Sequence, residues 1–303
     1  MRSKTETLGT NVEVGLDHAR DGSAYGGLRE THDRRGLLAA LKRFVSFNRR
    51  ISRALTPDHV HEANVFGVYR KVGVMLLSHP EVKRVIDVGA GRSWHFPEHY
   101  KEWYNIYLIG ADISAEEMAG NRLLDEKIVA DVVESIPIEP GSVDLVMASS
   151  GVEHFANNEK FLKNVLSALR PGGFLLAQFP NRYAPFAILN RLLPQSLGRK
   201  VLDMTMGRTA DVLGFRAYYD RTSYFAFRDI YRRVGFNELY YVPGFYSSTY
   251  FEFFVPLFLL SYLYDIIRFG LGAKRLSSYH LWVLQKPGNS GSSDTPFRFY
   301  AWK

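Results

Sequence analysis

The chain contains no cysteine, so it can form neither a disulfide nor a thiolate metal site. It also lacks a hydrophobic stretch long enough to cross a bilayer. Its longest nearly uncharged apolar run, residues 253–264, is short of the ~18 to 20 residues that a spanning helix needs. The first 20 residues hold no apolar core of the kind found in signal peptides. We therefore expect a cytoplasmic protein.

The composition is that of an ordinary globular protein, with 46% hydrophobic and 23% charged residues. A chain of 303 residues can form one large α/β domain with insertions or two small domains, and we expect one. The formal net charge of +7 indicates anionic surroundings without indicating nucleic-acid binding by itself.

One segment, RVIDVGAGRS at residues 84–93, organises the rest of the chain. Residues 85–88 have the apolar pattern of a buried strand, and Gly89 and Gly91 let the backbone turn tightly at its end. Such a turn exposes backbone N–H groups beside the start of a helix, where a carboxylate or phosphate can bind. The segment is therefore predicted to hold a ligand.

The spacing of the segment narrows the choice of ligand. A dinucleotide fingerprint would need a third glycine at position 94, which is Trp94, and no Gly-Lys-Ser/Thr follows as a P-loop would require. The remaining pattern, Asp87-x-Gly89-x-Gly91-x-Ser93, resembles motif I of the S-adenosylmethionine-dependent methyltransferases, with Ser93 in place of the family's last glycine. The resemblance implies S-adenosylmethionine as cofactor, bound in part by Asp87, Gly89, Ala90 and Gly91.

Two further aspartates follow predicted strands. Asp112 lies 21 residues beyond Gly91, where a carboxylate can accept hydrogen bonds from both ribose hydroxyls, and Ile113 follows it. A plain helix cap is the alternative for Asp112, but its register with the glycine turn favours ribose binding. Asp131 is placed to accept from an adenine amino group with Val132 as an apolar wall, and residues 130–137 resemble the family's adenine-binding segment. The alternative for Asp131 is a turn residue.

Two more segments resemble the family. SSGVEHF at 149–155, which includes Ser149, is similar to the turn after the fourth strand, and LRPGGF at 169–174 is similar to the turn into the fifth. The resemblance covers residues 80–180 closely, and 223–242 and 278–287 loosely. Asp144 is expected to be structural. No Asn/Asp-Pro-Pro-Tyr/Phe motif follows the fourth strand, so methylation of nucleic-acid bases is not expected.

Strand patterns alternate with helix patterns along the chain, and this predicts a Rossmann-like α/β fold. The resemblance implies a doubly wound, seven-stranded, mostly parallel sheet with an antiparallel last strand. The domain should span residues 36–287, with N-terminal helices at 36–79 and helical or aromatic insertions at 181–222 and 243–277. Residues 1–35 are expected to be a disordered tail and 288–303 a flexible one. The predicted strands are 85–88, 106–110, 127–130, 143–148, 174–178, 238–242 and 280–285.

Two segments leave alternatives open. Residues 36–55 read as a basic amphipathic helix, which either packs on the domain with a solvated basic face or lies on a membrane surface. Residues 250–270 are more apolar than a surface insertion needs to be. They could form a lid over the site, a protein interface or a contact with a bilayer. Because an apolar anchor and a basic patch together hold proteins on anionic membranes, we expect a peripheral enzyme at the inner face of a membrane.

The reaction follows from the cofactor that the resemblance implies. A sulfonium methyl group is already activated, so the protein must align an acceptor and exclude water, and a hydroxyl acceptor also needs a base. His154 and His95 are the candidate bases, and Glu153 could orient one of them. We expect methyl transfer to oxygen of a small-molecule, saccharide or lipid-linked acceptor. The alternative is a membrane-surface binding protein with a non-catalytic cofactor fold.

Overall fold

The computed structural model describes residues 24–58, 60, 64–192 and 216–288. The chain divides into two compact units, residues 1–44 and 45–303, and the sheet lies in the second unit. The described elements are α1 (Ala24–Ala54), α3 (Val65–Leu77), β1 (Arg84–Val88), α4 (Glu98–Tyr104), β2 (Tyr107–Asp112), α5 (Ala115–Ala119), β3 (Glu126–Val129), β4 (Val143–Ser149), η1 (Val152–His154), α6 (Asn158–Ala168), β5 (Leu169–Pro180), α7 (Pro185–Leu192), α9 (Tyr224–Val234), β6 (Asn237–Gly244), η3 (Ser248–Phe251), α10 (Val255–Gly270), η4 (Lys274–Leu276) and β7 (Tyr279–Gln285).

The sheet has seven strands in the order β3-β2-β1-β4-β5-β7-β6. Strands β1 to β5 pair in parallel, whereas β7 runs antiparallel to both β5 and β6. This confirms the predicted fold class. Along the chain, β2 and β3 are added on one side of β1, and β4 and the later strands lie on its other side. The direction in which strands are added therefore reverses between β1 and β4. In open α/β sheets a ligand binds at the carboxyl ends of the strands at such a switch point.

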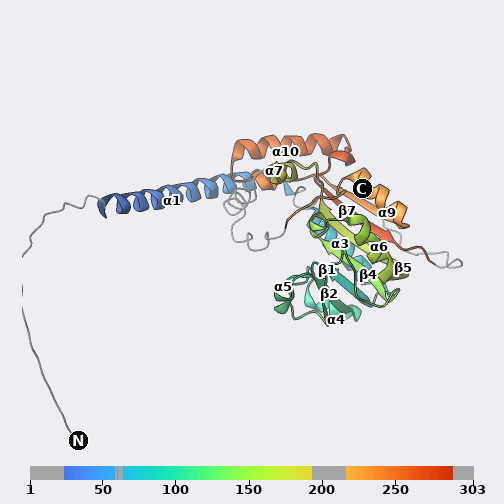
Figure 1. The fold of residues 1–303 in the computed structure, drawn as a ribbon. Coiled ribbons are helices and arrows are strands. Elements are labelled where there is room, and N and C mark those ends of the chain that lie inside the picture. Colours follow the sequence, from blue (N-terminus) through green and yellow to red (C-terminus); the bar gives the residue numbers. More distant parts are fainter. Residues whose placement is uncertain (1–23, 59, 61–63, 193–215, 289–303) are drawn as a thin grey trace, which may run out of the picture. The chain divides into compact units, whose positions relative to one another are not determined.

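Both faces of the sheet are covered by helices, which explains why its central strands are apolar on both sides. In β1, Ile86 and Val88 pack on the face covered by α6 and α9, and Val85 packs on the face covered by α3. Figure 1 shows α3, α6 and α9 lying along the sheet.

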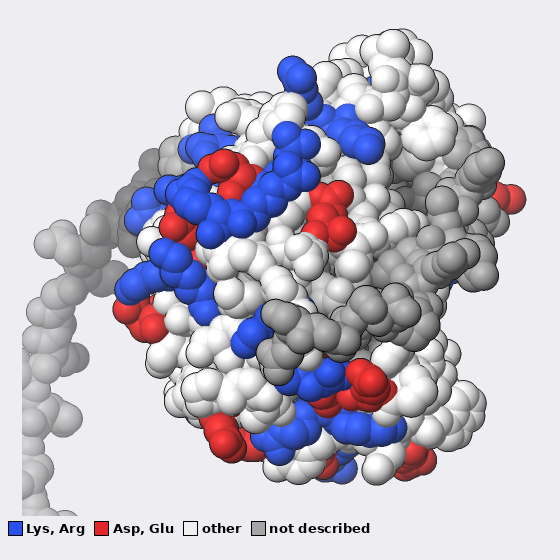
Figure 2. Space-filling view, turned by 90° about the vertical axis from the view of Figure 1, so that its right-hand side faces the viewer, with Lys and Arg blue, Asp and Glu red and all other residues white. Residues whose placement is uncertain are grey.

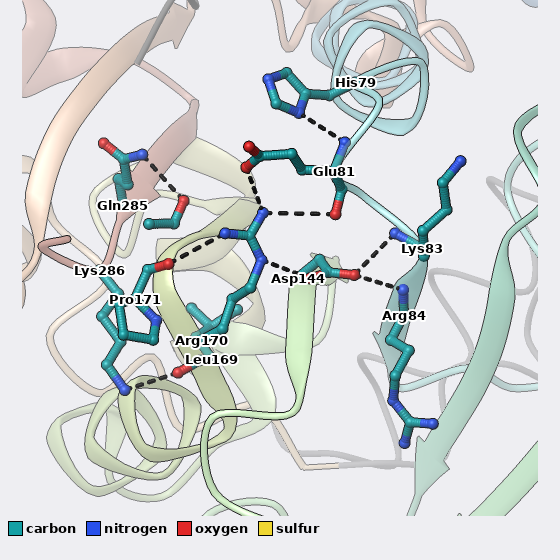
Figure 3. Close-up of polar contacts among 11 residues, drawn as sticks. His79, Glu81, Lys83, Arg84, Asp144, Leu169, Arg170, Pro171, Gln285 and Lys286 are labelled. Atoms are coloured by element: carbon teal, nitrogen blue, oxygen red, sulfur yellow. Dashed lines mark hydrogen bonds and ion pairs between the residues drawn. The ribbon is translucent and has the colours of Figure 1, made fainter. Parts of the chain in front are cut away.

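A polar network joins the amino-terminal ends of β1 and β4, at the edge of the sheet opposite the carboxyl ends (Figure 3). The Asp144 Oδ2 atom accepts hydrogen bonds from the backbone N–H groups of Lys83 and Arg84, each at 2.8 Å. Its Oδ1 atom accepts from Arg170 Nε at 2.6 Å, and Arg170 Nη2 donates to Glu81 Oε2 at 2.9 Å. The structural interpretation of Asp144 is confirmed, because its carboxylate ties two strand starts together.

The sequence predicts a turn at residues 169–174, but in the structure these residues are the first part of β5. Leu169 pairs with Val143, and the register shifts before the next pair, Leu145 with Phe174. A Cβ at Gly173 would lie 3.0 Å from the backbone oxygen of Arg170 and 3.1 Å from that of Asp144. Glycine is needed here because the backbone bulges against its neighbour.

Two helix boundaries also differ from the predictions. Helix α1 begins at Ala24, so the expected tail is wrong for residues 24–35, and residues 1–23 lie outside the described part. The segment contains helix-favouring Leu, Arg and Glu but no hydrophobic period, which is why the pattern missed it. The sequence also predicts a helix over residues 60–77, but helix α3 begins at Val65, where the Asn64 side chain caps it by accepting from Phe66 N at 2.9 Å.

The predicted insertions contain helices. Of residues 181–222, α7 is described and 193–215 lie outside the described residues; of 288–303, only residue 288 is described. Residues 243–277 form η3, α10 and η4. The carboxyl-terminal part of α1 packs on this insertion: Ser52 Oγ donates to the backbone oxygen of Glu252 at 3.2 Å, and Arg53 pairs with its carboxylate at 2.9 Å. Among the described helices none is long and apolar enough to cross a membrane.

Candidate functional site

The glycine turn after β1 is fixed against the end of β2. Gly89 and Gly91 have φ values of 71° and 47°, which other residues rarely adopt. Gly89 N donates to the backbone oxygen of Ala111 at 2.8 Å, and Gly91 N donates to Asp112 Oδ2 at 3.2 Å. Ala90 between them is buried. The predicted glycine turn is therefore present and is joined directly to Asp112.

Asp112 is held in place without capping a helix. Its Oδ1 atom accepts from Ser114 N at 2.9 Å, and the cap of α5 is Ser114, whose Oγ accepts from Glu117 N at 3.2 Å. A carboxylate offers about four acceptor positions, so two backbone donors leave capacity for ligand hydroxyls. Ile113 beside it is 56% exposed, which offers an apolar surface to a ligand.

Asp87 and Tyr69 lie beneath the turn. The carboxyl of Asp87 is buried, and burial together with the charge of Asp112 raises its pKa to about 7. Tyr69 of α3 has a buried hydroxyl with no hydrogen-bond partner among the described residues, and burial followed by the charge of Asp87 raises its pKa well above the usual value. A bound cation here would relieve the repulsion between the two carboxylates.

Asp131 lies in a local turn after β3, which is the alternative that the sequence left open beside adenine binding. Asp131 Oδ1 accepts from Val133 N at 2.9 Å, which is the local bond of an aspartate turn. The side chain of Val132 packs into the core. Asn164 of α6 holds the turn by donating from Nδ2 to the backbone oxygens of Val132 at 3.0 Å and Val133 at 2.9 Å. Asp131 itself is exposed at the site edge.

The end of β4 is joined to β5 and lies against β1. The hydroxyls of Ser149 and Ser150 donate to Gln178 Oε1 at 3.2 and 3.3 Å, and Ser150 has a φ of 55°. A Cβ on Gly151 would lie 3.8 Å from the backbone oxygen of Val88. The turn after β4 therefore meets the end of β1, beside the glycine turn.

The two histidine candidates lie apart in different surroundings. The His154 ring contacts the backbone oxygen of Arg216 through Nδ1 at 3.1 Å, so Glu153 does not orient it as expected. Partial desolvation lowers the pKa of His154, and the contact with Arg216 acts in the opposite direction. His95 packs edge-on to Tyr69 at 6.2 Å between ring centroids, and desolvation and the charge of Arg70 lower its pKa.

Glu153 is the group whose importance the sequence did not reveal. It is 7% exposed, its Oε2 atom is buried without a hydrogen-bond partner among the described residues, and burial raises its pKa to about 8. Its backbone oxygen accepts from the N–H groups of Tyr218 and Tyr219, both at 2.9 Å. The sequence placed Glu153 in a motif, but nothing in it indicated burial.

The site has the groups that the predicted cofactor requires. The glycine turn is bonded through Gly91 N–H to Asp112, which offers a fixed carboxylate beside the exposed Ile113. Asp87 and the unpartnered Tyr69 hydroxyl suit an ammonium group such as that of a methionine moiety. S-adenosylmethionine therefore fits the residues present.

Comparison with known proteins agrees with this. Residues 86–177 match the family model described as a methyltransferase domain. Norajmaline N-methyltransferase of Rauvolfia serpentina is 30% identical over 98 residues, which cover 30% of this chain and 33% of that protein. The chain thus matches about a third of the length of this curated relative.

Solved structures also resemble the chain. A methyltransferase of Listeria monocytogenes, described as S-adenosylmethionine-dependent, aligns with a TM-score of 0.46 and 14% identity over 72% of this chain and 98% of that one. A phosphoethanolamine N-methyltransferase of Haemonchus contortus in complex with S-adenosyl-L-methionine aligns with a TM-score of 0.45 and 14% identity over 71% of this chain and 52% of that one.

Proposed function

On the premise that residues 86–177 form a methyltransferase domain, we propose that the chain is an S-adenosylmethionine-dependent methyltransferase. The observation that carries the proposal is the bond from Gly91 N–H to Asp112, which joins the glycine turn to a carboxylate at the switch point of the sheet. The alternative, a binding protein with a non-catalytic remnant of this fold, gains no support, because the turn and its carboxylates are intact.

The residues have separable tasks in this proposal. When bound, the cofactor supplies a methyl group activated on a sulfonium. Asp112 accepts from the ribose hydroxyls, Gly89, Ala90, Gly91 and Asp87 surround the methionine part, and Ile113, Asp131 and Val132 border the adenine. Ser149 supports the turn after β4 through Gln178. His154 and His95 stay candidates for the base, since a lowered pKa keeps each neutral and able to accept a proton near pH 7.

The acceptor that we propose is a small-molecule, saccharide or lipid-linked hydroxyl compound. Support for an amphiphilic acceptor comes from α10, whose polarity is inverted. Its buried stripe includes Ser261, Asp265 and Arg268. Asp265 accepts from the N–H groups of Ser247 and Ser248, each at 2.8 Å. Polar bonds therefore hold the helix on the domain, and its apolar residues face outward.

The outward face of α10 suits a membrane surface. Leu260, Leu263 and Ile267 are 64%, 55% and 50% exposed, and Lys274 and Arg275 are exposed just beyond the helix. Figure 2 shows one face of the protein, where Lys and Arg side chains gather in the upper half with acidic side chains interspersed among them. An apolar helix face next to basic residues is the combination that binds anionic bilayers. We propose peripheral contact with the inner face of a membrane.

Calorimetry tests the proposed function without knowledge of the acceptor. We expect wild-type protein to bind S-adenosylmethionine and S-adenosylhomocysteine and not a nicotinamide dinucleotide. No detectable binding of either at millimolar concentration, with binding of the dinucleotide instead, contradicts the proposal. An acceptor screen that follows conversion of S-adenosylmethionine to S-adenosylhomocysteine then identifies the acceptor class.

A further inference from the structure

Three tyrosines from separate segments have hydroxyl groups on which the charge of Glu153 acts. They are Tyr219 in the stretch before α9, Tyr250 in η3 and Tyr279 at the start of β7. The charge of Glu153 contributes to the raised pKa of each of the three hydroxyls, although burial is the larger cause in every case. The charge of Glu153 therefore acts on all three hydroxyls.

The cluster is built on aromatic packing. The hydroxyls of Tyr250 and Tyr279 are hydrogen-bonded to each other. Phe186 of α7 stacks on both rings, with centroid distances of 4.4 Å to Tyr250 and 5.4 Å to Tyr279. Asn190 Nδ2 lies 3.5 Å from the Tyr219 hydroxyl. Elements from both insertions thus complete a polar wall over the end of β4.

Among the described residues, no other residue is hydrogen-bonded or ion-paired to the carboxyl group of Glu153. The backbone oxygen ties down Tyr218 and Tyr219, and any residue could supply that oxygen. The carboxyl oxygen Oε2 is instead buried with no hydrogen-bond partner among the described residues. An unpaired buried carboxyl is costly, and such groups occur where a ligand or a proton completes them.

Glu153 follows β4, whereas the proposed cofactor residues Asp112 and Asp131 follow β2 and β3. It lies in η1, directly after β4, and the preceding Gly151 meets the end of β1 beside the glycine turn. The cofactor residues Asp112 and Asp131 follow β2 and β3, on the other side of β1 from β4. The turn after β4 and the tyrosine wall are therefore left for the acceptor.

We propose that Glu153, rather than either histidine, is the catalytic base, and that Tyr219, Tyr250 and Tyr279 line the subsite for the acceptor hydroxyl. This rests on the proposed function and deepens it. The acceptor O–H bond breaks and its proton passes to the Glu153 carboxylate. The oxygen forms a bond to the methyl carbon, the carbon–sulfur bond breaks, and its electron pair stays on sulfur.

The chemistry of the group suits this task. A carboxyl group whose pKa lies about 8 is a stronger base than an exposed glutamate. The other titratable groups that act on the cluster are the three tyrosines themselves and Arg191 of α7, whose charge acts on Tyr219. Among the ion pairs of the described residues no cation is paired with Glu153, and its own backbone N–H is the one other group that acts on the pKa of its carboxyl group.

Sinefungin tests the proposal without an acceptor. This analogue of the cofactor carries a protonated amine in place of the methylsulfonium, whereas S-adenosylhomocysteine carries neither, and both share the ribose, adenine and methionine parts. If Glu153 faces the methyl position, its carboxylate pairs with the amine. We expect Glu153→Gln to weaken sinefungin at least tenfold while S-adenosylhomocysteine affinity changes less than twofold.

A matched control and a wild-type measurement keep the test decisive. Glu134→Gln makes the same chemical change on the surface and should alter neither affinity, since Glu134 is an exposed partner of Lys160. In wild type at pH 7, sinefungin should release close to one more proton than S-adenosylhomocysteine, because Glu153 is mostly protonated until the amine arrives. Calorimetry in two buffers of different ionisation enthalpy measures this even if the variant does not fold.

The outcomes separate this inference from the proposed function. Equal loss of both ligands in Glu153→Gln, or equal proton release by both in wild type, shows that Glu153 does not face the methyl position and overturns the inference alone. If wild type binds neither ligand, the proposed function itself fails. Selective loss of sinefungin together with the extra proton supports the assignment.

Discussion

The aspartates at the ends of β2 and β3 differ in how firmly the fold holds them. Asp112 accepts from two backbone N–H groups, one of which comes from the glycine turn itself. Asp131 accepts from one N–H group within its own turn. A ligand that bridges both should therefore depend more on Asp112, because its carboxylate is already oriented before the ligand arrives.

We predict that Asp112→Ala weakens S-adenosylhomocysteine binding by about 1–3 kcal/mol, the range for a hydrogen bond to a charged group. Asp131→Ala should have a smaller effect, since the exposed aspartate is less constrained. Calorimetry of the two variants beside wild type measures both. An Asp112→Ala protein that binds as tightly as wild type contradicts the ribose assignment.

A second residue-scale prediction concerns the pH dependence of turnover. A base must be deprotonated to act, so turnover should rise with pH through the pKa of the base. For Glu153 the rise should centre at about pH 8. For His154 it should centre below the usual histidine value of about 6.5, because desolvation lowers that pKa. A rate profile with the acceptor found by screening decides between them, and Glu153→Gln should remove the rise near pH 8.

At the scale of elements, local patterns predicted the central strands well because apolar runs and glycine turns are short-range signals. The residues of the acceptor wall gave no such signal, since Tyr219, Tyr250 and Tyr279 are far apart in the sequence and meet only through the fold. The same holds for Asn164, which fixes the turn after β3 from α6. Pattern reasoning therefore named the residues that we propose for the cofactor and missed those that we propose for the acceptor.

The Asp144 network gives an element-scale prediction. Asp144→Ala leaves the side chain of Arg170 and two backbone N–H groups without their acceptor, so the free energy of unfolding should fall by about 2–4 kcal/mol. Chemical denaturation measures the loss. The surface substitution Glu134→Ala is the control and should stay within about 0.5 kcal/mol of wild type. Cofactor affinity of the folded Asp144→Ala protein should be unchanged, because the network lies at the opposite edge of the sheet from the glycine turn.

At the scale of the whole molecule, the sequence predicted an apolar segment but not which of its side chains face outward. Phe258, one of the most apolar residues of α10, is fully buried and anchors the helix, whereas Leu260, Leu263 and Ile267 are exposed. A helix with a polar buried stripe and an apolar outer face is the reverse of the usual arrangement at a protein surface. The hydrogen bonds that Asp265 accepts from Ser247 N and Ser248 N hold α10 in this orientation.

We predict that wild-type protein floats with vesicles containing phosphatidylserine at low salt and that Leu260→Ser, Leu263→Ser, Ile267→Ser together abolish flotation. Burying these three half-exposed side chains should contribute about 3 kcal/mol, which corresponds to roughly a hundredfold in partitioning. Lys274→Gln with Arg275→Gln should weaken binding to these vesicles, and neutral phosphatidylcholine vesicles should bind less in every case. The control is Trp103→Ser, which removes an exposed aromatic residue from α4, distant from α10, and should float like wild type. If wild type stays in the soluble fraction at low salt, α10 does not bind membranes and its outer face awaits a protein partner instead.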